Sequence, residues 1–453
     1  MVDQMYFQRD IDEVLLDWMG EPNRKPLVLR GARQTGKSAS VREFGKRFDL
    51  FLELNLERHV DLSLVRSCSS AAELLAALSS RHNLPRFPDS TLLFLDEIQQ
   101  SPEAIQWLRF LHEDHPQLAV LAAGSLLEVR LEQGGFSFPA GRVAFRTLRP
   151  FSCFEFFRAR GKDVLLEQLC EAVRDGCQPP AALHEQALNM LREYLLVGGM
   201  PEAVRAWAGS GGEVVVQRVH QDLLQALAED IQKYRGPRDL EYLESAFENL
   251  KHHYGARFRY ENFAPGYRSK LMKSALAKLE GALLMTRAWP TSSLDLPLSV
   301  RPRSAPKLLA LDVGLALGDI GVTSESLRRS PLEGLAGGRA AEVFAAQQIL
   351  ASTTDEGERL HFWVRESSRA NAEVDFLLAG SDGPLPVEVK AGTSGSLKSM
   401  HQFLWRSGRR LGVRLHAGQY ADETHRVRMP DCQMEYRLLS VPLYLAGMLR
   451  SLV

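Results

Sequence analysis

The stretch "LVLRGARQTGKSAS", residues 27–40, decides the expected fold. A short apolar run leads to Gly31, and four residues later Gly36-Lys37-Ser38 opens a helical segment. Glycines let backbone N–H groups turn inward around phosphate oxygens, while the lysine and the hydroxyl serve the outer phosphates and Mg²⁺. The pattern predicts a phosphate-binding loop; the alternative is a glycine-rich turn that binds nothing. The predicted nucleotide-binding residues are Gly31, Ala32, Arg33, Gln34, Thr35, Gly36, Lys37, Ser38 and Ala39.

A second stretch, "TLLFLDEIQQ" at 91–100, reads as a fully buried strand that ends in two acids. Open α/β sheets bind ligands at the carboxyl ends of their strands, which is where Asp96 and Glu97 stand. We predict that Asp96, together with Ser38, holds Mg²⁺ directly or through water. Glu97 is then the predicted catalytic residue that orients and polarises the attacking water, with Lys37 as its phosphate-binding partner. The alternative is an acidic loop after a core strand.

A third strand, in "LAVLAAGSLLEV" at 118–129, ends at Gly124-Ser125. Ser125 is a candidate for contact with the γ-phosphate from the neighbouring strand tip, against the alternative of a simple turn. Arg142 and Arg149 are candidates for an arginine that completes the site, either in cis or from a neighbouring subunit. Solvated surface arginines are the competing interpretation.

Composition limits the class of protein. The chain has 453 residues, which predicts about two to four domains, and a net charge of -1, so nucleic-acid or membrane binding would need a local patch. Five scattered cysteines without a CxxC pair argue against a disulfide framework and against a zinc site. The mixed, acidic N-terminus does not resemble a signal peptide, and no apolar run approaches the ~20 residues of a bilayer span. We expect a cytoplasmic, reduced, multidomain protein with no membrane partner.

The pattern along the chain gives the expected order of elements. Up to residue 155, short apolar runs alternate with amphipathic stretches such as 72–78 and 104–111, which predicts a parallel sheet covered by helices. Residues 156–250 look helical. After Arg339 we predict a helix at 340–350, a strand at 360–364, a hairpin, and then another helix and strand.

A basic segment lies in the middle of the chain. Residues 251–310 contain eleven lysines and arginines against three acids. The stretch 267–289 predicts a helix with an apolar face of Met272, Ala275 and Leu279, followed by a strand. This combination suits a winged helix-turn-helix whose last helix approaches DNA. The alternative is a solvated face that packs against a sister domain. The predicted DNA-contacting residues are Arg268, Lys270, Lys273 and Lys278, with Tyr254, Arg257, Arg259 and Tyr260 just upstream.

The hairpin "EVDFLLAGSDGPLPVEVKAG", residues 373–392, carries three unexpected charges. The strand period places Glu388 and Lys390 on one face, with Asp375 across from them. Two facing carboxylates repel each other unless a cation separates them or one is protonated. We therefore predict Mg²⁺ at Asp375 and Glu388, with Lys390 orienting a water or stabilising charge and Glu342 supporting the site. The alternative is a Glu388–Lys390 surface ion pair in a module that binds without cutting.

These motifs, with "LRPFSCFEFF" at 148–157, "YLLVGGMPEAV" at 194–204 and "KLLALDVGLA" at 307–316, give the sequence a family resemblance. It resembles, over nearly its whole length, the prokaryotic AAA-type ATPases whose C-terminal half carries a domain of unknown function. The helix glutamate, strand aspartate and ExK arrangement also looks like the core of PD-(D/E)xK nucleases. Departures are Leu126, where the family usually has a small polar residue, and Val374, where the nuclease motif usually has proline.

The resemblance implies an α/β protein with four parts. They are a P-loop ASCE/AAA-type ATPase core at 1–155, a helical lid at 156–235, a winged-helix-like module at 236–306, and a restriction-endonuclease-like domain at 307–453. It implies ATP and Mg²⁺ as cofactors. The basic segment makes DNA the predicted partner. ATPases of this type often take an arginine from a neighbouring subunit, which would imply a homo-oligomer, but nothing in the sequence fixes the number of subunits. Three functions stay open: an ATP-driven machine acting on DNA, a nucleotide-controlled switch, and a binding scaffold with a residual ATP site.

Overall fold

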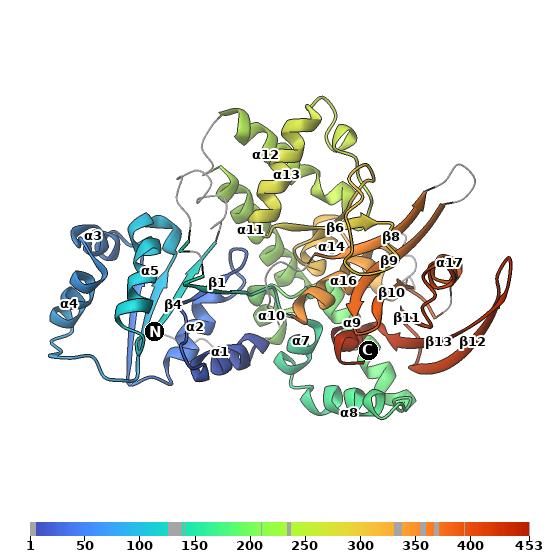
Figure 1. Cartoon of the computed structure of the whole chain (residues 1–453), viewed down its shortest axis with the longest axis horizontal. Coiled ribbons are helices and arrows are strands. Elements are labelled where there is room, and N and C mark those ends of the chain that lie inside the picture. Colours follow the sequence, from blue (N-terminus) through green and yellow to red (C-terminus); the bar gives the residue numbers. More distant parts are fainter. Residues whose placement is uncertain are drawn as a thin grey trace. The chain divides into compact units, whose positions relative to one another are not determined.

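The computed structural model describes residues 6–125, 138–139, 141–209, 211–232, 237–329, 338–353, 359–366, 371–393 and 395–452. Two compact units make up the chain, the first mainly residues 1–149 and the second mainly residues 150–453 (Figure 1). Leu126 lies outside the described residues. No helix in the described part of the chain is both long enough and apolar enough to cross a membrane.

The first unit contains a parallel sheet of five strands in the order β2-β3-β4-β1-β5. Strand β4 lies between β1 and β3. The strand that leads into the phosphate loop and the strand that ends at Asp96 are therefore not neighbours. The predicted apolar runs at 27–29, 51–54, 92–95 and 119–123 all fall within these strands. The strands are β1 Leu27–Arg30, β2 Leu50–Asn55, β3 Thr91–Asp96, β4 Ala119–Gly124 and β5 Ala144–Thr147.

Helices cover both faces of this sheet, and the two-residue period of the strands decides which side chains each face receives. Leu92 and Phe94 pack on the face of α1 and α2, whereas Leu93 and Leu95 pack on the face of α3, α4 and α5. Because every residue of β3 is buried, an alternating polar pattern is absent there, as is typical of a parallel sheet. The helices are α1 Asp10–Gly20, α2 Lys37–Gly45, α3 His59–Ser67, α4 Ala71–Arg81, the 3₁₀ turn η1 Ile98–Gln100, and α5 Pro102–Asp114.

The second unit begins with helices, as the sequence predicts for residues 156–250. The first of these, α7, starts with a capping box in which Ser152 and Glu155 bond each other's backbone N–H groups. The helices up to the second sheet are α7 Cys153–Ala159, α8 Asp163–Arg174, α9 Ala181–Val197, α10 Pro201–Ala208, α11 Gly212–Ile231, α12 Pro237–His253, η2 Tyr260–Asn262 and α13 Ser269–Gly281.

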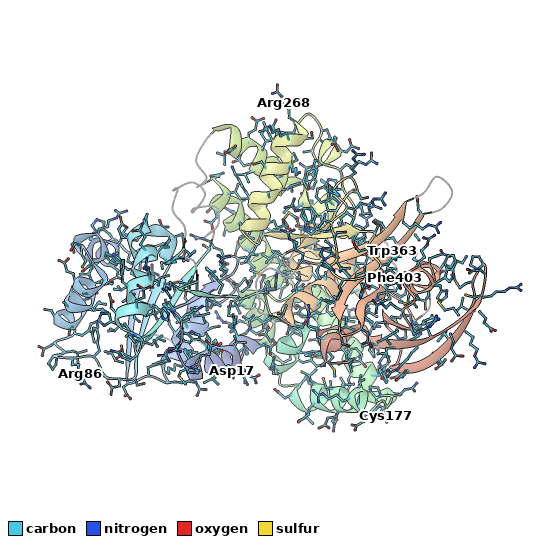
Figure 2. All side chains as sticks on the ribbon, in the orientation of Figure 1. Asp17, Arg86, Cys177, Arg268, Trp363 and Phe403 are labelled. Carbon is cyan, nitrogen blue, oxygen red and sulfur yellow. The ribbon has the colours of Figure 1, made fainter. Side chains whose placement is uncertain are left out.

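A mixed sheet of eight strands, in the order β12-β13-β11-β10-β9-β8-β6-β7, forms the rest of the second unit (Figure 1). Trp363 on β8 packs edge-on against Phe403 of α17 in its core (Figure 2). The strands are β6 Met285–Thr291, β7 Lys307–Ala310, β8 His361–Glu366, β9 Asn371–Gly380, β10 Gly383–Val389, β11 Leu411–His416, β12 Ala421–Arg428 and β13 Gln433–Pro442. Its helices are α14 Val313–Asp319, α15 Ser324–Arg329, α16 Arg339–Ala351, α17 Lys398–Ser407, η4 Leu443–Met448 and α18 Leu449–Leu452.

The order of elements predicted after Arg339 is confirmed: α16, then β8, the β9–β10 hairpin, α17 and β11. Strands β8, β9 and β10 are antiparallel neighbours, and β11 joins β10 in parallel. The boundaries at 235 and 306 stay predictions. Strands β6 and β7, which fall on either side of residue 306, pair with each other in one sheet.

A buried polar hub holds the start of the second unit together. The Asp312 carboxylate accepts hydrogen bonds from Gly199 N at 2.6 Å, Gln347 Nε2 at 2.9 Å and Leu315 N at 2.9 Å. A Cβ on Gly198 would overlap the Asp312 carboxylate, so the "GG" of "VGGMPEA" permits this close approach. The hub therefore joins the end of α9, the start of α14 and the middle of α16.

Candidate functional site

The phosphate-loop segment between β1 and α2 has the backbone that its glycines allow. Gly36 has a φ of 97°, in the left-handed region, and it caps the N-terminus of α2. A Cβ on Gly31 would lie 2.5 Å from the Leu148 carbonyl oxygen and 2.9 Å from Thr35 Oγ1. Only glycine fits position 31 without moving the backbone at Leu148, directly after β5. The first turn of α2, with its unbonded N–H groups, therefore begins directly after the loop.

Lys37 is folded into this loop. Its ammonium donates hydrogen bonds to Gly31 O at 2.9 Å and to Ala32 O at 2.8 Å. Burial lowers the pKa of Lys37 to about 8, although the carboxylates of Glu97 and Asp96 act in the opposite direction. A buried cation beside the loop, held by two carbonyl oxygens, is suited to meeting the negative charge of a phosphate.

Ser38 and Asp96 meet, as the sequence predicts. The Ser38 hydroxyl donates to Asp96 Oδ2 at 2.8 Å, and Asn55 at the end of β2 approaches the same oxygen at 3.4 Å. Burial raises the pKa of Asp96, and the Ser38 hydrogen bond opposes that shift. A hydroxyl and a carboxylate are the oxygen donors that Mg²⁺ prefers, so this pair fits the magnesium ion that such loops use.

Glu97 follows Asp96 with a φ of 52°, an uncommon backbone for a residue with a side chain. Its Oε2 accepts hydrogen bonds from Gln99 Nε2 at 2.5 Å and from Ser125 Oγ at 3.3 Å. Ser125 reaches Glu97 because β4, which ends at Gly124, is the immediate neighbour of β3. The structure thus brings together Lys37, Ser38, Asp96, Glu97 and Ser125 at one edge of the sheet.

Arg142 lies elsewhere, which corrects its prediction as an arginine that completes this site in cis. It precedes β5, whose parallel pairing with β1 starts at Leu27 and Ala144, so it lies at the amino edge of the sheet. There its guanidinium pairs with Glu113 in the last turn of α5 at 2.9 Å. The phosphate loop is at the opposite edge, because it follows the carboxyl end of β1. A contribution of Arg142 to a neighbouring subunit's site stays a prediction.

Arg149 follows β5 at the carboxyl edge, and its backbone is tied to the phosphate loop through Arg9. The Arg9 guanidinium donates to Arg149 O at 2.8 Å and to Thr35 O at 3.2 Å. Arg9 is almost fully buried and was not predicted as part of the site. A lone arginine before an amphipathic helix carries no sequence signal for this role.

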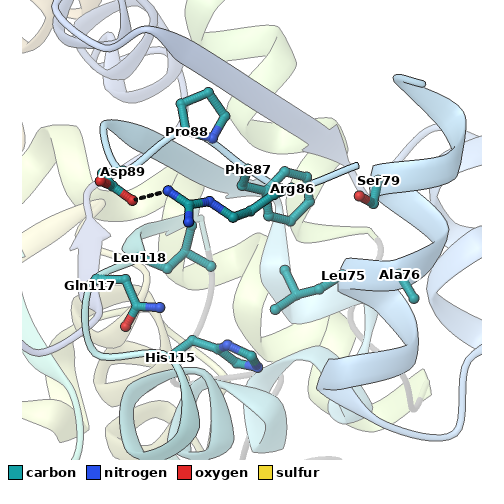
Figure 3. Close-up of a pocket in the computed structure, with 10 residues that line it drawn as sticks. All are labelled: Leu75, Ala76, Ser79, Arg86, Phe87, Pro88, Asp89, His115, Gln117 and Leu118. Carbon is teal, nitrogen blue, oxygen red and sulfur yellow. Dashed lines mark hydrogen bonds and ion pairs between the residues drawn. The ribbon is translucent and has the colours of Figure 1, made fainter. Parts of the chain in front are cut away.

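A pocket of about 380 Å³ lies in the first unit, away from the phosphate loop (Figure 3). It lies between α4, the segment before β3 and the segment before β4, where Arg86 pairs with Asp89 at 3.2 Å. These segments meet at the amino ends of β3 and β4, the edge opposite Asp96 and Glu97. The pocket is therefore separate from the predicted nucleotide site.

The charged hairpin of the second unit has the register that the sequence predicts. Strands β9 and β10 pair Val387 with Phe376, so the next pair places Glu388 beside Asp375. Glu388 Oε1 accepts a hydrogen bond from Lys390 Nζ at 2.7 Å. The other Glu388 oxygen is buried and has no hydrogen-bond partner among the described residues. Asp375 Oδ2 accepts from Val389 N at 2.8 Å.

Lys307, at the start of β7, was missed by the sequence interpretation. Its ammonium is buried and lies 2.7 Å from Glu342 Oε2, 2.7 Å from Glu373 Oε1 and 3.3 Å from Asp375 Oδ1. Burial alone would lower the pKa of Lys307, but the three carboxylates outweigh it and raise that pKa. Its only sequence signal is its place in "KLLALDVGLA", which does not reveal a partner.

Two members of this carboxylate cluster (Glu342, Glu373, Asp375 and Glu388) have raised pKa values. Burial raises the pKa of Glu342 to about 7 and that of Glu388 to about 8, and the charge of Asp375 adds to both shifts. Within the described ranges, no group of three or more His, Cys, Asp or Glu side chains could hold a metal ion. Lys307 and Val389 N already engage both oxygens of Asp375. For both reasons, the donor set does not fit the magnesium ion predicted at Asp375 and Glu388.

Comparison with protein families identifies the first unit. The model described as an AAA domain matches residues 23–157. The chain contains an ATPase-like AAA domain. Its parallel central sheet fits a P-loop ATPase core, as the sequence predicts. Residues 188–326 and 337–432 match two models that are both described as domains of unknown function, DUF8612 and DUF4143. The winged-helix-like and nuclease-like assignments therefore stay predictions.

Three solved structures show weak similarity to the chain. The Walker-type ATPase PABY2304 of Pyrococcus abyssi is 15% identical, with a TM-score of 0.44, over 70% of this chain and 96% of that chain. The Aeropyrum pernix ORC1 protein in complex with DNA is 14% identical, with a TM-score of 0.26, over 73% and 94%. PCH-2 of C. elegans is 13% identical, with a TM-score of 0.21, over 37% and 47%. Scores this low carry no functional argument, and no curated protein matches the chain.

Gln99 is a further residue of the AAA domain that the sequence interpretation missed. It is buried, and its amide nitrogen holds the Glu97 carboxylate. Gln99 stands in the quoted motif "TLLFLDEIQQ", two residues after Glu97. A spacing of two does not by itself predict that two side chains of a turn are in contact. The left-handed backbone of Glu97 makes this contact, and only the structure reveals it.

The predicted basic helix corresponds to α13. Its apolar face of Met272, Ala275 and Leu279 is buried, as predicted, and β6 follows the helix. Arg268, Lys270 and Lys273 are exposed, and Arg268 points away from the body of its unit (Figure 2). Lys278 differs, because it pairs with Asp239 of α12 at 2.7 Å. Contact with DNA stays a prediction for all four residues.

Proposed function

We propose that the AAA domain binds ATP with Mg²⁺ and hydrolyses it. The observation that carries this proposal is the 2.8 Å hydrogen bond from Ser38 to Asp96, with Glu97 on the next residue. It joins the phosphate loop to the strand that ends in the two acids, across the intervening strand β4. A site with a buried lysine, a hydroxyl and two carboxylates contains the groups that phosphoryl transfer requires.

Each side chain has a separate role in this proposal. Lys37 exchanges the carbonyl oxygens of Gly31 and Ala32 for phosphate oxygens, and the loop N–H groups bind the remaining oxygens. Glu97, oriented by Gln99, accepts a proton from the attacking water. Ser125 donates to Glu97 in the present arrangement and is proposed to contact the γ-phosphate of bound ATP. When bound through Ser38 and Asp96, Mg²⁺ neutralises charge on the phosphates.

The experiment is an ATP hydrolysis assay on the purified full chain, with and without Mg²⁺. We expect Lys37→Ala to abolish binding of a fluorescent ATP analogue, and Glu97→Gln to bind it without turnover. Wild-type affinity in Lys37→Ala would refute the phosphate-loop assignment. Arg142 from a neighbouring subunit is proposed to complete the site in an oligomer, which a dependence of turnover on protein concentration would reveal.

We propose further that the second unit acts on DNA through α13. The support is a surface on which Arg268, Lys270 and Lys273 are exposed while the opposite helix face is buried. Cations that project from a helix bind the phosphate backbone, and such binding weakens as salt displaces the released counterions. Lys278 contributes less, since Asp239 already neutralises it.

The test measures anisotropy of labelled duplex DNA at several salt concentrations. We expect Lys270→Glu with Lys273→Glu to weaken binding and to reduce its salt dependence. Lys278→Glu, as the matched control on the same helix, has the smaller effect. Binding that does not respond to the double reversal would exclude α13 as the DNA-contacting element.

The nuclease-like fold is the remaining part of the proposal for the second unit. Its support is the order α16, β8, β9, β10, α17 and β11, with Glu342 on the first helix and Asp375, Glu388 and Lys390 on the hairpin. A second candidate function, a module that binds without cutting, is favoured by the Lys307 contacts. A nuclease assay with and without ATP separates the two candidates, comparing wild type with Asp375→Ala and Lys37→Ala.

A further inference from the structure

Lys307 is the central cation of the carboxylate cluster. Three carboxylates from two different elements converge on its ammonium: Glu342 from α16, and Glu373 and Asp375 from β9. The side chain is 4% exposed, so water does not screen these charges. An isolated buried ammonium would lose its proton, whereas one surrounded by carboxylates keeps its charge.

Most of the carboxylate oxygens around Lys307 are already engaged. Asp375 Oδ2 accepts from Val389 N, and Glu373 Oε2 lies 3.4 Å from the Arg257 guanidinium. Glu388 Oε1 accepts from Lys390, while the buried Glu388 Oε2 has no hydrogen-bond partner among the described residues. A divalent ion at this place would have to displace an ammonium and find its ligands among oxygens most of which are already bonded.

A tethered ammonium and a divalent ion are alternative ways of separating facing carboxylates. The ion brings two charges, but it must lose part of its hydration shell, and Mg²⁺ loses water reluctantly. The lysine brings one charge at a fixed high local concentration, because folding of β7 places it there. Charge is then balanced by the remaining cations, Lys390 and Arg257, and by the buried environment of Glu388.

We propose that the Lys307 ammonium takes the place of a divalent cation in this cluster, so that the second unit maintains its carboxylates without a metal ion. The cluster then works as an internal ion network that fixes β7 against α16 and β9. Removal of the Lys307 charge leaves Glu342, Glu373 and Asp375 without their shared cation, and these carboxylates then rearrange around an added divalent ion. This inference does not depend on ATP hydrolysis by the AAA domain.

Mn²⁺ is the probe, and the free ion is quantified by electron paramagnetic resonance. The full chain carries Asp96→Ala in every sample, so that the predicted metal position of the AAA domain does not contribute. With native Lys307 we expect no stoichiometric Mn²⁺ binding. With Lys307→Met we expect one ion per chain, bound at least about ten-fold more tightly than by the chain with Lys307. That ratio corresponds to a difference of about 1.4 kcal/mol in binding free energy. Adding Asp375→Asn to Lys307→Met abolishes that binding.

Lys307→Arg is the matched control, because it keeps a buried cation and gains no Mn²⁺. The thermal unfolding midpoint provides a second readout: Mn²⁺ raises it for Lys307→Met and leaves it unchanged for the chain with Lys307. A Lys307→Met chain that does not fold alone is refolded with Mn²⁺ present, and recovery supports the proposal. The proposal is overturned if the chain with Lys307 binds Mn²⁺ in a manner that Asp375→Asn abolishes. It is equally overturned if Lys307→Met, folded or refolded, gains no ion.

Discussion

Ser38 Oγ lies 2.8 Å from Asp96 Oδ2, and this hydrogen bond joins two segments that are 58 residues apart in the chain. One segment begins α2 and the other ends β3. Their contact requires β1, which leads into the phosphate loop, and β3 to end at the same edge of the parallel sheet, with β4 between them. The predictions for the AAA domain start from this geometry.

Glu97→Gln removes the proposed general base and keeps the size of the side chain. We expect turnover of ATP to fall by roughly 100- to 10,000-fold, as for other positioned bases, while ATP affinity stays within a few-fold. Single-turnover hydrolysis and equilibrium binding measure the two effects separately. A variant with near-normal turnover would remove Glu97 from the mechanism. Retained DNA-dependent behaviour in the ATP-bound variant would favour a nucleotide switch over a machine.

Arg142→Ala is expected to leave the turnover of an isolated chain unchanged. The reason is its ion pair with Glu113 at the amino edge of the sheet, away from Asp96. Turnover measured over a range of protein concentrations checks this. A defect that appears only at high concentration would assign Arg142 to a neighbouring subunit's site.

Lys307→Met leaves Glu342 and Asp375 facing each other without their shared cation. Breaking a buried ion pair by removing one partner costs about 3–5 kcal/mol of unfolding free energy, so we expect a loss of that order without added metal. Urea unfolding of the full chain, monitored by a probe in the second unit, measures this loss of unfolding free energy. Lys273→Met, an exposed lysine on α13, is the control and changes stability by less than about 0.5 kcal/mol.

The acidity of Glu342 and Glu388 predicts how stability depends on pH. Their pKa values are raised by burial from 4.5 to about 7 and about 8, next to Asp375, Glu373, Lys307 and Lys390. Between pH 4.5 and 8 these two glutamates therefore bind more protons in the folded chain than in the unfolded chain, so their contribution to stability decreases as the pH rises through this window. Lys307, whose pKa is raised, keeps its stabilising charge throughout the window.

Glu388→Gln tests this dependence, because the amide is neutral at every pH. We expect the variant to gain on the order of 1 kcal/mol relative to wild type near pH 8, and to show a flatter profile from pH 5 to 8. Thermal unfolding across that range provides the comparison. A wild-type profile that rises with pH in the same way as the variant profile would contradict the raised pKa of Glu388.

Asp312→Ala removes the acceptor of three buried donors: Gly199 N, Leu315 N and Gln347 Nε2. Unsatisfied buried groups cost about 1–3 kcal/mol each, so we expect a total loss of at least about 3 kcal/mol in the second unit. Ser70→Ala, which removes the exposed N-cap of α4 in the first unit, costs about 1 kcal/mol. Comparable losses for both variants would show that the Asp312 hub is not a main source of stability.

Local patterns in the sequence were sufficient for much of the fold. The apolar runs at 27–29 and 92–95 became buried parallel strands, and the basic helix turned its apolar face of Met272, Ala275 and Leu279 inward. The hairpin register that places Glu388 beside Asp375 followed from a turn of two residues between strands of known period. In each case the information lies within about ten residues, where backbone geometry relates spacing to position.

The sequence by itself therefore determined the phosphate loop, the acid pair after β3 and the charged hairpin, because glycine placement and strand period act locally. Only the tertiary structure decided that Gln99 holds Glu97, that Arg142 lies at the opposite edge, and that Lys307 fills the carboxylate cluster. Lys307 is 35 residues from Glu342 and 68 from Asp375, and no spacing rule connects such distant positions. The order of strands in the sheet decides which distant charges meet, and that order depends on the packing of the whole unit.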